Sequence, residues 1–173
     1  MFIELIGVFM AGIAVAGVVM LINIATGRRL PKWIIPVAAG LAMIGTTISN
    51  EYSWYDRTAG NLPDGLTIAQ TVEDQSFYRP WTYAYPFVER FVAVDTGTMR
   101  TNPALPDQRM VDLYFFGRWS PISKGPVVFD CAANRRADLI DGADFAPDGS
   151  LPEDAWRAVA PDDPVLQTTC KAA

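Results

Sequence analysis

The 173-residue chain contains no histidine and only two cysteines. Histidine is the commonest general base at neutral pH and the commonest metal ligand, so its absence excludes Ser-His-Asp or Cys-His catalytic sets and His-based zinc sites within this chain. The cysteines do not form a Cys-x-x-Cys motif, which argues against a thioredoxin-like redox role. No phosphate-binding glycine loop or Gly-x-Ser-x-Gly segment occurs. The sequence predicts a protein that is not an enzyme and that has no cofactor or metal ion.

Charge is scarce in residues 1–49, which hold one acid, Glu4, and three bases. Residues 50–173 hold 18 acids and 11 bases, a net charge of −7. An acidic surface repels the phosphate backbone, so nucleic acid is not an expected partner. The charge distribution predicts two parts, an apolar region 1–49 and an acidic domain 50–173.

Two long apolar runs, residues 2–26 and 33–49, fill the first part. Folded as helices, the first run exceeds the thickness of a bilayer core (about 30 Å) and the second is at the short end of the spanning range. The alternatives are a cleaved signal peptide for the first run and buried helices of a soluble core for both. The N-terminus has Glu4 and no base, unlike a signal peptide, and the near absence of charge disfavours a soluble core. We therefore predict a hairpin of two transmembrane helices.

The short loop 27–32 between the runs carries Arg28, Arg29 and Lys32. Basic loops stay on the cytoplasmic side of a membrane. We therefore expect the loop in the cytoplasm, and both termini and the large domain on the periplasmic side of the inner membrane of a Gram-negative bacterium.

Small residues recur within both runs at spacings that let helix backbones approach closely. They allow either packing of the hairpin against itself or docking onto other integral membrane subunits, and the second interpretation is favoured. The residues concerned are Gly7, Ala11, Gly12, Ala16, Gly40 and Gly45.

The second part has the pattern of a small β-rich α+β extracytoplasmic domain. Runs rich in valine and aromatic residues predict strands at 66–72, 87–94, 110–119 and 127–129, with an irregular loop at 102–107. Ser150, Pro152 and Glu153 predict the start of a helix that ends before Pro161. Tyr52, Trp54 and Tyr55 follow the second apolar run, where an interfacial aromatic belt is expected.

Cys131 and Cys170 are predicted to form a structural disulfide, which fits an oxidising compartment. Two reduced thiols or a bridge to a partner are the alternatives. Residues 141–149 have the composition of a calcium loop, but their spacing does not fit the EF-hand pattern, so turn-forming Asp and Gly explain them adequately.

The stretch 77–87 is unusually aromatic. Tyr, Trp and Arg are enriched in interface hot spots, so a ligand groove or docking patch is one interpretation. The other, favoured by residue types alone, is core packing together with an aromatic face near the bilayer. The candidate patch consists of Tyr78, Arg79, Trp81, Tyr83 and Tyr85.

Three functions remain open. The leading hypothesis is a membrane-anchored accessory or scaffold subunit of a larger inner-membrane complex, whose acidic domain makes protein–protein contacts, for instance with a basic soluble partner. The second is a periplasmic ligand-binding or sensing module that uses residues 77–87. The third is an envelope hydrolase that uses carboxylates.

Overall fold

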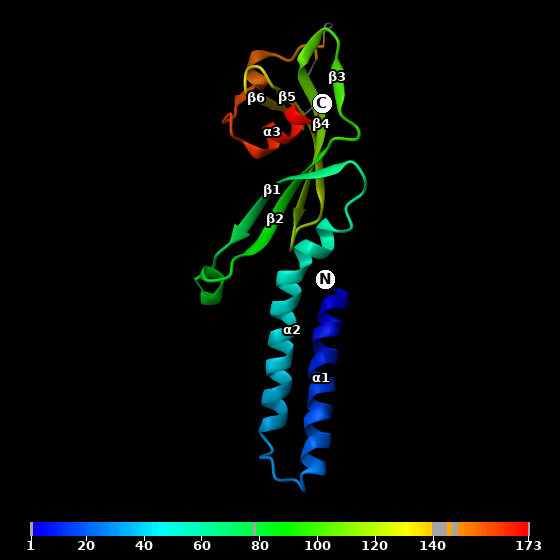
Figure 1. Cartoon of the computed structure of the whole chain (residues 1–173), viewed down its shortest axis with the longest axis vertical. Coiled ribbons are helices and arrows are strands. Elements are labelled where there is room, and N and C mark those ends of the chain that lie inside the picture. The colour runs from blue at the N-terminus through cyan, green and yellow to red at the C-terminus, as the bar shows by residue number, and fades with distance from the viewer. Residues whose placement is uncertain (1, 78, 140–144, 147–148, 173) are drawn as a thin grey trace. The chain divides into compact units, whose positions relative to one another are not determined.

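The computed structural model describes residues 2–77, 79–139, 145–146 and 149–172. The chain divides into two compact units, Met1–Arg57 and Thr58–Ala173 (Figure 1). The first unit is a pair of long apolar helices, as predicted, and the second is an antiparallel β domain.

The helical hairpin consists of α1 (Phe2–Ala25) and α2 (Ile34–Ala59). Gly27 has a φ of +73°, the left-handed conformation in which a helix commonly ends. The side-chain oxygen of Asn23 accepts a hydrogen bond of 3.0 Å from the backbone N–H of Leu30, which fastens the loop to the end of α1. Pro36 lies in the first turn of α2, where its missing N–H costs no helical hydrogen bond.

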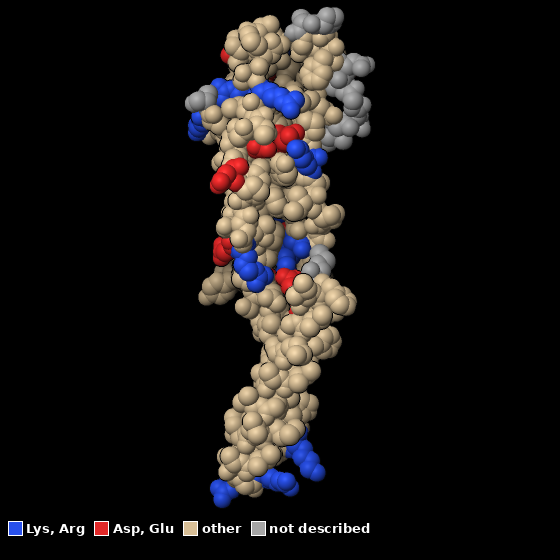
Figure 2. Space-filling model, turned by 90° about the vertical axis from the view of Figure 1, so that its right-hand side faces the viewer, with Lys and Arg blue, Asp and Glu red and all other residues tan. Residues whose placement is uncertain are grey.

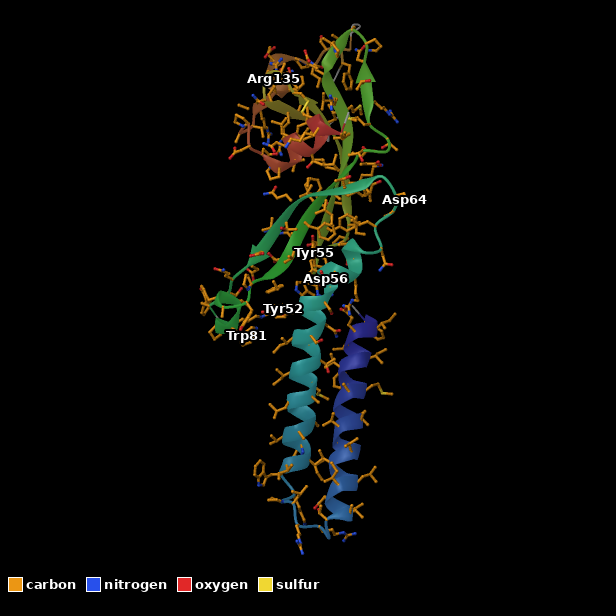
Figure 3. All side chains as sticks on the ribbon, viewed as in Figure 1. Tyr52, Tyr55, Asp56, Asp64, Trp81 and Arg135 are labelled. Carbon is orange, nitrogen blue, oxygen red and sulfur yellow. A yellow bond between two sulfur atoms is a disulfide. The ribbon has the colours of Figure 1, made fainter. Side chains whose placement is uncertain are left out.

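The helix α2 continues past the apolar run, which ends at residue 49, as far as Ala59. The extra turns carry Tyr52 and Tyr55 (Figure 3). Trp54 is buried, so it does not join an exposed aromatic belt. At the open end of the hairpin, Arg57 of α2 pairs with Glu4 of α1 at 3.6 Å. The acid of α1 is therefore paired with the base of the last turn of α2.

The surface of the hairpin is almost wholly apolar and exposed. Only 6% of the most apolar window of each helix is buried, and side chains such as Ile3, Ile13 and Leu41 are more than 60% exposed. Figure 2 shows a long tan surface here, with basic side chains at the loop end, where Arg28, Arg29 and Lys32 lie. Two exposed apolar helices of this length suggest a membrane environment.

Gly12 is where the two helices approach most closely among the glycines of the hairpin. It is the buried residue of α1, and a Cβ built on it would lie within 3.0 Å of the Met43 side chain. The other predicted packing glycines, Gly7, Gly40 and Gly45, have no neighbouring atom within 4 Å of such a Cβ. Ala11 and Ala16 are half-buried. Of the four predicted packing glycines, Gly12 alone lies at the contact between α1 and α2.

Gly12→Leu should destabilise the hairpin by about 1–3 kcal/mol, because the larger side chain must displace Met43. Gly17 is the matched control, since it has open space around its Cα, and Gly17→Leu should leave hairpin stability unchanged. Thermal unfolding of α1 and α2 in detergent, followed by far-ultraviolet circular dichroism, measures the difference. Equal effects of the two substitutions would contradict the packing described.

The described residues of the second unit form one seven-stranded antiparallel sheet with the curvature of a half-barrel. Its strand order is β1-β2-β4-β5-β6-β7, with β3 paired to β4. The bounds are β1 Leu66–Asp74, β2 Phe87–Asp95, β3 Arg100–Asn102, β4 Leu105–Gly117, β5 Ser123–Asp130, β6 Arg135–Asp138 and β7 Arg157–Ala158. The four predicted strands are confirmed, at somewhat different bounds.

One face of the sheet packs on the helix α3 (Pro164–Lys171). Val165 and Leu166 of α3 contact a cluster that includes Val94, Leu113 and Phe129 of β2, β4 and β5. On the opposite face, Val128 packs with residues of the segment that ends in the 3₁₀ turn η2 (Glu153–Ala155). Because β5 is covered on both faces, its apolar residues 127–129 run consecutively instead of alternating.

The prediction of a helix beginning at Ser150 is wrong. That segment forms only η2 and the short strand β7, while the α-helix of the domain is α3. Asp163 caps α3 by accepting hydrogen bonds from the N–H groups of Val165 and Leu166, and Pro164 occupies the first turn. The same sequence pattern, an acidic or hydroxyl capping residue followed by proline, occurs at Ser150 and at Asp163. The helix forms only after Asp163, where Val165 and Leu166 are buried against the sheet.

The prediction of an irregular loop at 102–107 is also wrong. β3 ends at Asn102 and β4 begins at Leu105, so these residues form a tight hairpin. The side-chain oxygen of Asn102 accepts a hydrogen bond from the N–H of Ala104 and stabilises the turn. Pro103 and Pro106 led to the prediction of a loop, because proline is disfavoured within strands.

Candidate functional site

Cys131 and Cys170 form the predicted disulfide, with their Cα atoms 5.9 Å apart. Cys131 directly follows β5, and Cys170 lies in α3, so the bridge ties the helix to the end of the sheet. Beside it, Arg109 of β4 donates hydrogen bonds of 2.9 and 2.8 Å to the backbone carbonyls of Thr169 and Cys170. A covalent bond and an arginine thus hold the C-terminal turn of α3, and the disulfide points to an oxidising, extracytoplasmic compartment.

A second polar cluster surrounds Asp130, which is nearly buried at the end of β5. Its carboxylate accepts hydrogen bonds from the N–H groups of Ala132 and Ala133 and from Nε of Arg135, the last at 2.9 Å. Arg135 also contacts Glu153 and stacks over the ring of Trp156 at 4.6 Å. The hydrogen bond to Asp130 raises the pKa of Arg135, so the guanidinium stays charged. The cluster holds the β5–β6 turn and the η2 segment together.

An open hollow of about 570 Å³ lies beside this cluster, lined by the start of β4 with Asp107 and Gln108, by the β5–β6 turn and by Arg135 of β6. Two of its charged lining residues, Asp130 and Arg135, form an ion pair with each other at 2.9 Å. Within the described residues, no group of three or more Cys, Asp or Glu side chains is placed to hold a metal ion. The candidate calcium segment 141–149 lies largely outside the described residues.

The aromatic stretch forms the connection between β1 and β2, with a 3₁₀ turn η1 (Pro80–Tyr83) at its centre. Thr82 is buried within it: its hydroxyl donates to the carbonyl of Arg79 and accepts from the N–H of Ser76. The hydroxyl of Ser76 in turn donates to Asp74 at 2.6 Å. These bonds give the loop a defined conformation without burying its aromatic rings.

The rings of this loop point outwards. Phe77, Trp81, Tyr83 and Tyr85 are exposed by 85, 43, 59 and 72%. Core packing of the stretch is therefore wrong for these side chains and correct only for Phe87, the first residue of β2. Arg79 lies over the ring of Phe87 at 6.0 Å. Tyr78, the remaining residue of the predicted patch, lies outside the described residues.

A second exposed apolar loop lies at the same end of the sheet. The strand register pairs Asp74 with Phe87, Arg90 with Gly117 and Phe115 with Ser123, so the β1–β2 and β4–β5 connections leave the sheet on the same side. We call the exposed side chains of these two connections, together with exposed Phe115 near the end of β4, the aromatic end. They are Phe77, Trp81, Tyr83, Tyr85, Phe115, Trp119 and Ile122.

Figure 3 shows Trp81 at the tip of the β1–β2 hairpin and Arg135 far from it at the other end of the sheet. Sequence reasoning found the first loop from its composition and missed the second. The sequence feature that could have revealed the second loop is the turn segment 118–122. It contains two large apolar residues, Trp119 and Ile122, between two strands. Only the register shows that it lies beside residues more than 30 positions away.

Lys124 and Asp112 form an ion pair of 2.9 Å on the strands leading to the aromatic end. The hydrogen bond to Asp112, and then that to Tyr114, raises the pKa of Lys124 above its ordinary value of 10.5. A raised lysine pKa stabilises the folded state below pH 10.5, and this contribution is lost as the pH rises through the folded-state pKa. The effect on stability is therefore confined to alkaline solution.

Asp112→Asn should lower the pKa of Lys124 towards its ordinary value, since the principal cause of the shift is removed. Titration of the Lys124 side chain by nuclear magnetic resonance measures this directly. Lys171 is the control, because its described side-chain hydrogen bond is to the neutral Gln167; the side-chain resonances of Lys171 at neutral pH should be the same in both proteins. An unchanged Lys124 titration curve would show that Asp112 is not the cause.

A hollow of about 450 Å³ borders the aromatic end, lined by strand residues that include Val72, Phe91 and Phe116. The rings of Phe91 and Phe116 stack at 4.6 Å between centroids. The described residues of the predicted patch, Arg79, Trp81, Tyr83 and Tyr85, do not line this hollow or the one near Asp130. The patch is thus a protruding surface and not the wall of either hollow.

Comparison of the chain with protein-family models, with curated proteins and with solved structures finds no match in any of the three.

Proposed function

We propose that the chain is a non-catalytic, membrane-anchored accessory subunit that binds other integral membrane subunits through its helical hairpin. In this proposal α1 and α2 span the bilayer, the loop with Arg28, Arg29 and Lys32 is cytoplasmic, and the disulfide-bonded domain is periplasmic. The exposed apolar surface of the hairpin, its basic loop and the Cys131–Cys170 bridge support this placement.

The observation that carries the proposal is a regular stripe on the side of α1 that faces away from α2. At 100° per residue, positions 3, 7, 10, 14, 17 and 21 fall within an arc of about 80° opposite Gly12, which contacts Met43 of α2. All six positions are exposed, and three of them are small: Ile3, Gly7, Met10, Ala14, Gly17 and Leu21.

The spacing of this stripe suits a further helix. Steps of four and three residues are the repeat of left-handed helix pairs, the commonest crossing in membrane bundles. Gly7 and Gly17 have no atom within 4 Å of a built Cβ, so a neighbouring backbone has room to approach them. A helix that served only as an anchor in lipid has no need of small residues at these positions.

Extraction in mild detergent followed by mass spectrometry tests the proposal. The wild-type chain should co-purify with at least one other integral membrane protein, and Gly17→Leu should abolish the association because it fills the stripe. Gly17→Ala keeps the residue small and is the matched control, expected to retain the partner. Recovery of the wild-type chain alone, as a monodisperse species, would overturn the proposal.

The placement of the domain has its own test. Protease added to spheroplasts should digest residues 58–173 while leaving a fragment that contains the hairpin. Protection of the domain in intact spheroplasts, with digestion only after lysis, would reverse the proposed orientation.

The ligand-binding alternative has one observation in its favour, the exposure of Trp81, Tyr83 and Tyr85. These rings do not line either of the two hollows described above, so a small molecule bound to them would stay largely exposed to solvent. A broad, protruding surface fits an extended partner better than a small ligand.

A further inference from the structure

We propose that the aromatic end is a lipid-binding surface that rests in the headgroup region of the same bilayer that holds the hairpin, with anionic phospholipids as the preferred ligands. The inference rests on the membrane anchoring proposed above, but concerns a different surface, the ends of the β1–β2 and β4–β5 hairpins.

The first argument is the chemistry of the exposed side chains. Trp and Tyr concentrate at membrane–water interfaces because their rings are apolar at one end and polar at the other. The aromatic end exposes two tryptophans and two tyrosines, together with Phe77, Phe115 and Ile122. The hydrogen bonds of Thr82 fix the backbone of the first loop, so its rings are displayed outwards with no collapse onto the domain.

The second argument is charge. The domain is strongly acidic, yet the β1–β2 connection 75–86 and residues 113–125 around the β4–β5 connection contain no Asp or Glu, and the nearest acids are on the adjoining strands. The same segments contain the bases Arg79 and Arg118, together with Lys124, whose charge is paired with Asp112 of β4. Arg118 lies over the ring of Trp119 at 5.0 Å, which brings a positive charge to the second apolar loop. Basic groups beside exposed aromatic rings are complementary to phosphate headgroups above an acyl boundary.

The third argument is chain length. The polar turns of α2 that follow the apolar run, residues 50–59, extend about 15 Å. After the short connection 60–65, the nine residues of β1 cover about 30 Å and end at the aromatic end. The chain between the end of the apolar run and the aromatic end is therefore long enough to allow these rings to contact the headgroup region.

The test uses the full chain with 5-fluorotryptophan, reconstituted in nanodiscs that contain equal parts of a zwitterionic and an anionic phospholipid. The five tryptophans give separate fluorine resonances, each assigned by one Trp→Phe substitution. A spin-labelled lipid should broaden Trp81 and Trp119 several-fold, and a water-soluble gadolinium complex should broaden them little. Trp156, which stacks on Arg135 at the other end of the sheet, is the internal control and should show no lipid broadening.

Two outcomes separate the proposals. If Trp33, which adjoins α2, is broadened by the lipid probe while Trp81 and Trp119 respond only to the gadolinium complex, the hairpin is anchored and the lipid-binding surface is refuted. If Trp33 also responds only to the gadolinium complex, the anchoring proposal itself fails.

A second comparison tests the choice of anionic lipid. Arg79→Gln combined with Arg118→Gln should reduce the lipid broadening of Trp81 and Trp119 to the level seen in purely zwitterionic nanodiscs. Arg157→Gln removes one exposed base from the other end of the sheet and should change nothing. Equal broadening in all three proteins and in both lipid compositions would overturn the preference for anionic headgroups.

Discussion

Replacing both Cys131 and Cys170 with alanine is expected to lower the free energy of unfolding of the β domain by about 3–4 kcal/mol. The bridge closes a loop between residues 39 positions apart, and in the chain-entropy model its loss restores that much conformational freedom to the unfolded state. Urea unfolding of the full chain in detergent, followed by near-ultraviolet circular dichroism, measures the change.

The single substitution Cys131→Ala and chemical reduction of the wild-type chain provide the controls. Both break the same crosslink, so both should shift the unfolding midpoint as far as the double substitution does. A reduced wild-type chain with unchanged stability would show that the hydrogen bonds from Arg109 to the end of α3 suffice without the bridge.

Asp130→Ala is expected to destabilise the domain by about 2–4 kcal/mol. The side chain of Asp130 is only 9% exposed, and its removal leaves two backbone N–H groups and the Nε of Arg135 without their acceptor. The loss should also increase hydrogen exchange of the Ala132 and Ala133 amides. Urea unfolding together with amide exchange measures both consequences.

Glu153→Gln is the matched control for Asp130, because both carboxylates bind the same arginine. The side chain of Glu153 is 84% exposed, so its ion pair is screened by water and its loss should cost less than about 1 kcal/mol. Similar destabilisation by the two substitutions would contradict the role assigned to burial.

Locally encoded features were predictable from the sequence. The two apolar helices follow from long runs of apolar residues, because Glu4 near the start of the first run is the one charge in residues 2–26 and 33–49. The Cys131–Cys170 bridge follows from counting, since two cysteines in one domain allow one intramolecular pairing. The strands around Phe91 and Val127 follow from dense β-branched and aromatic residues.

The errors occurred where two segments carried the same local signal. Proline after a capping residue predicted a helix near Ser150, but the helix forms at Pro164, where Val165 and Leu166 can be buried against the sheet. Burial depends on which strands are neighbours, and no window of sequence contains that information. The exposure of Trp81 could not be predicted from the sequence either, because aromatic residues occur both in protein cores and on binding surfaces.

The sequence by itself thus determined the apolar hairpin, its basic loop, the acidic β-rich domain and the disulfide, because each depends on composition or on neighbouring residues. Only the tertiary structure decided which glycine packs inside the hairpin and which face of α1 remains open. It alone brought the loops that carry Trp81 and Trp119 to one end of the sheet, because antiparallel register joins residues that are far apart along the chain.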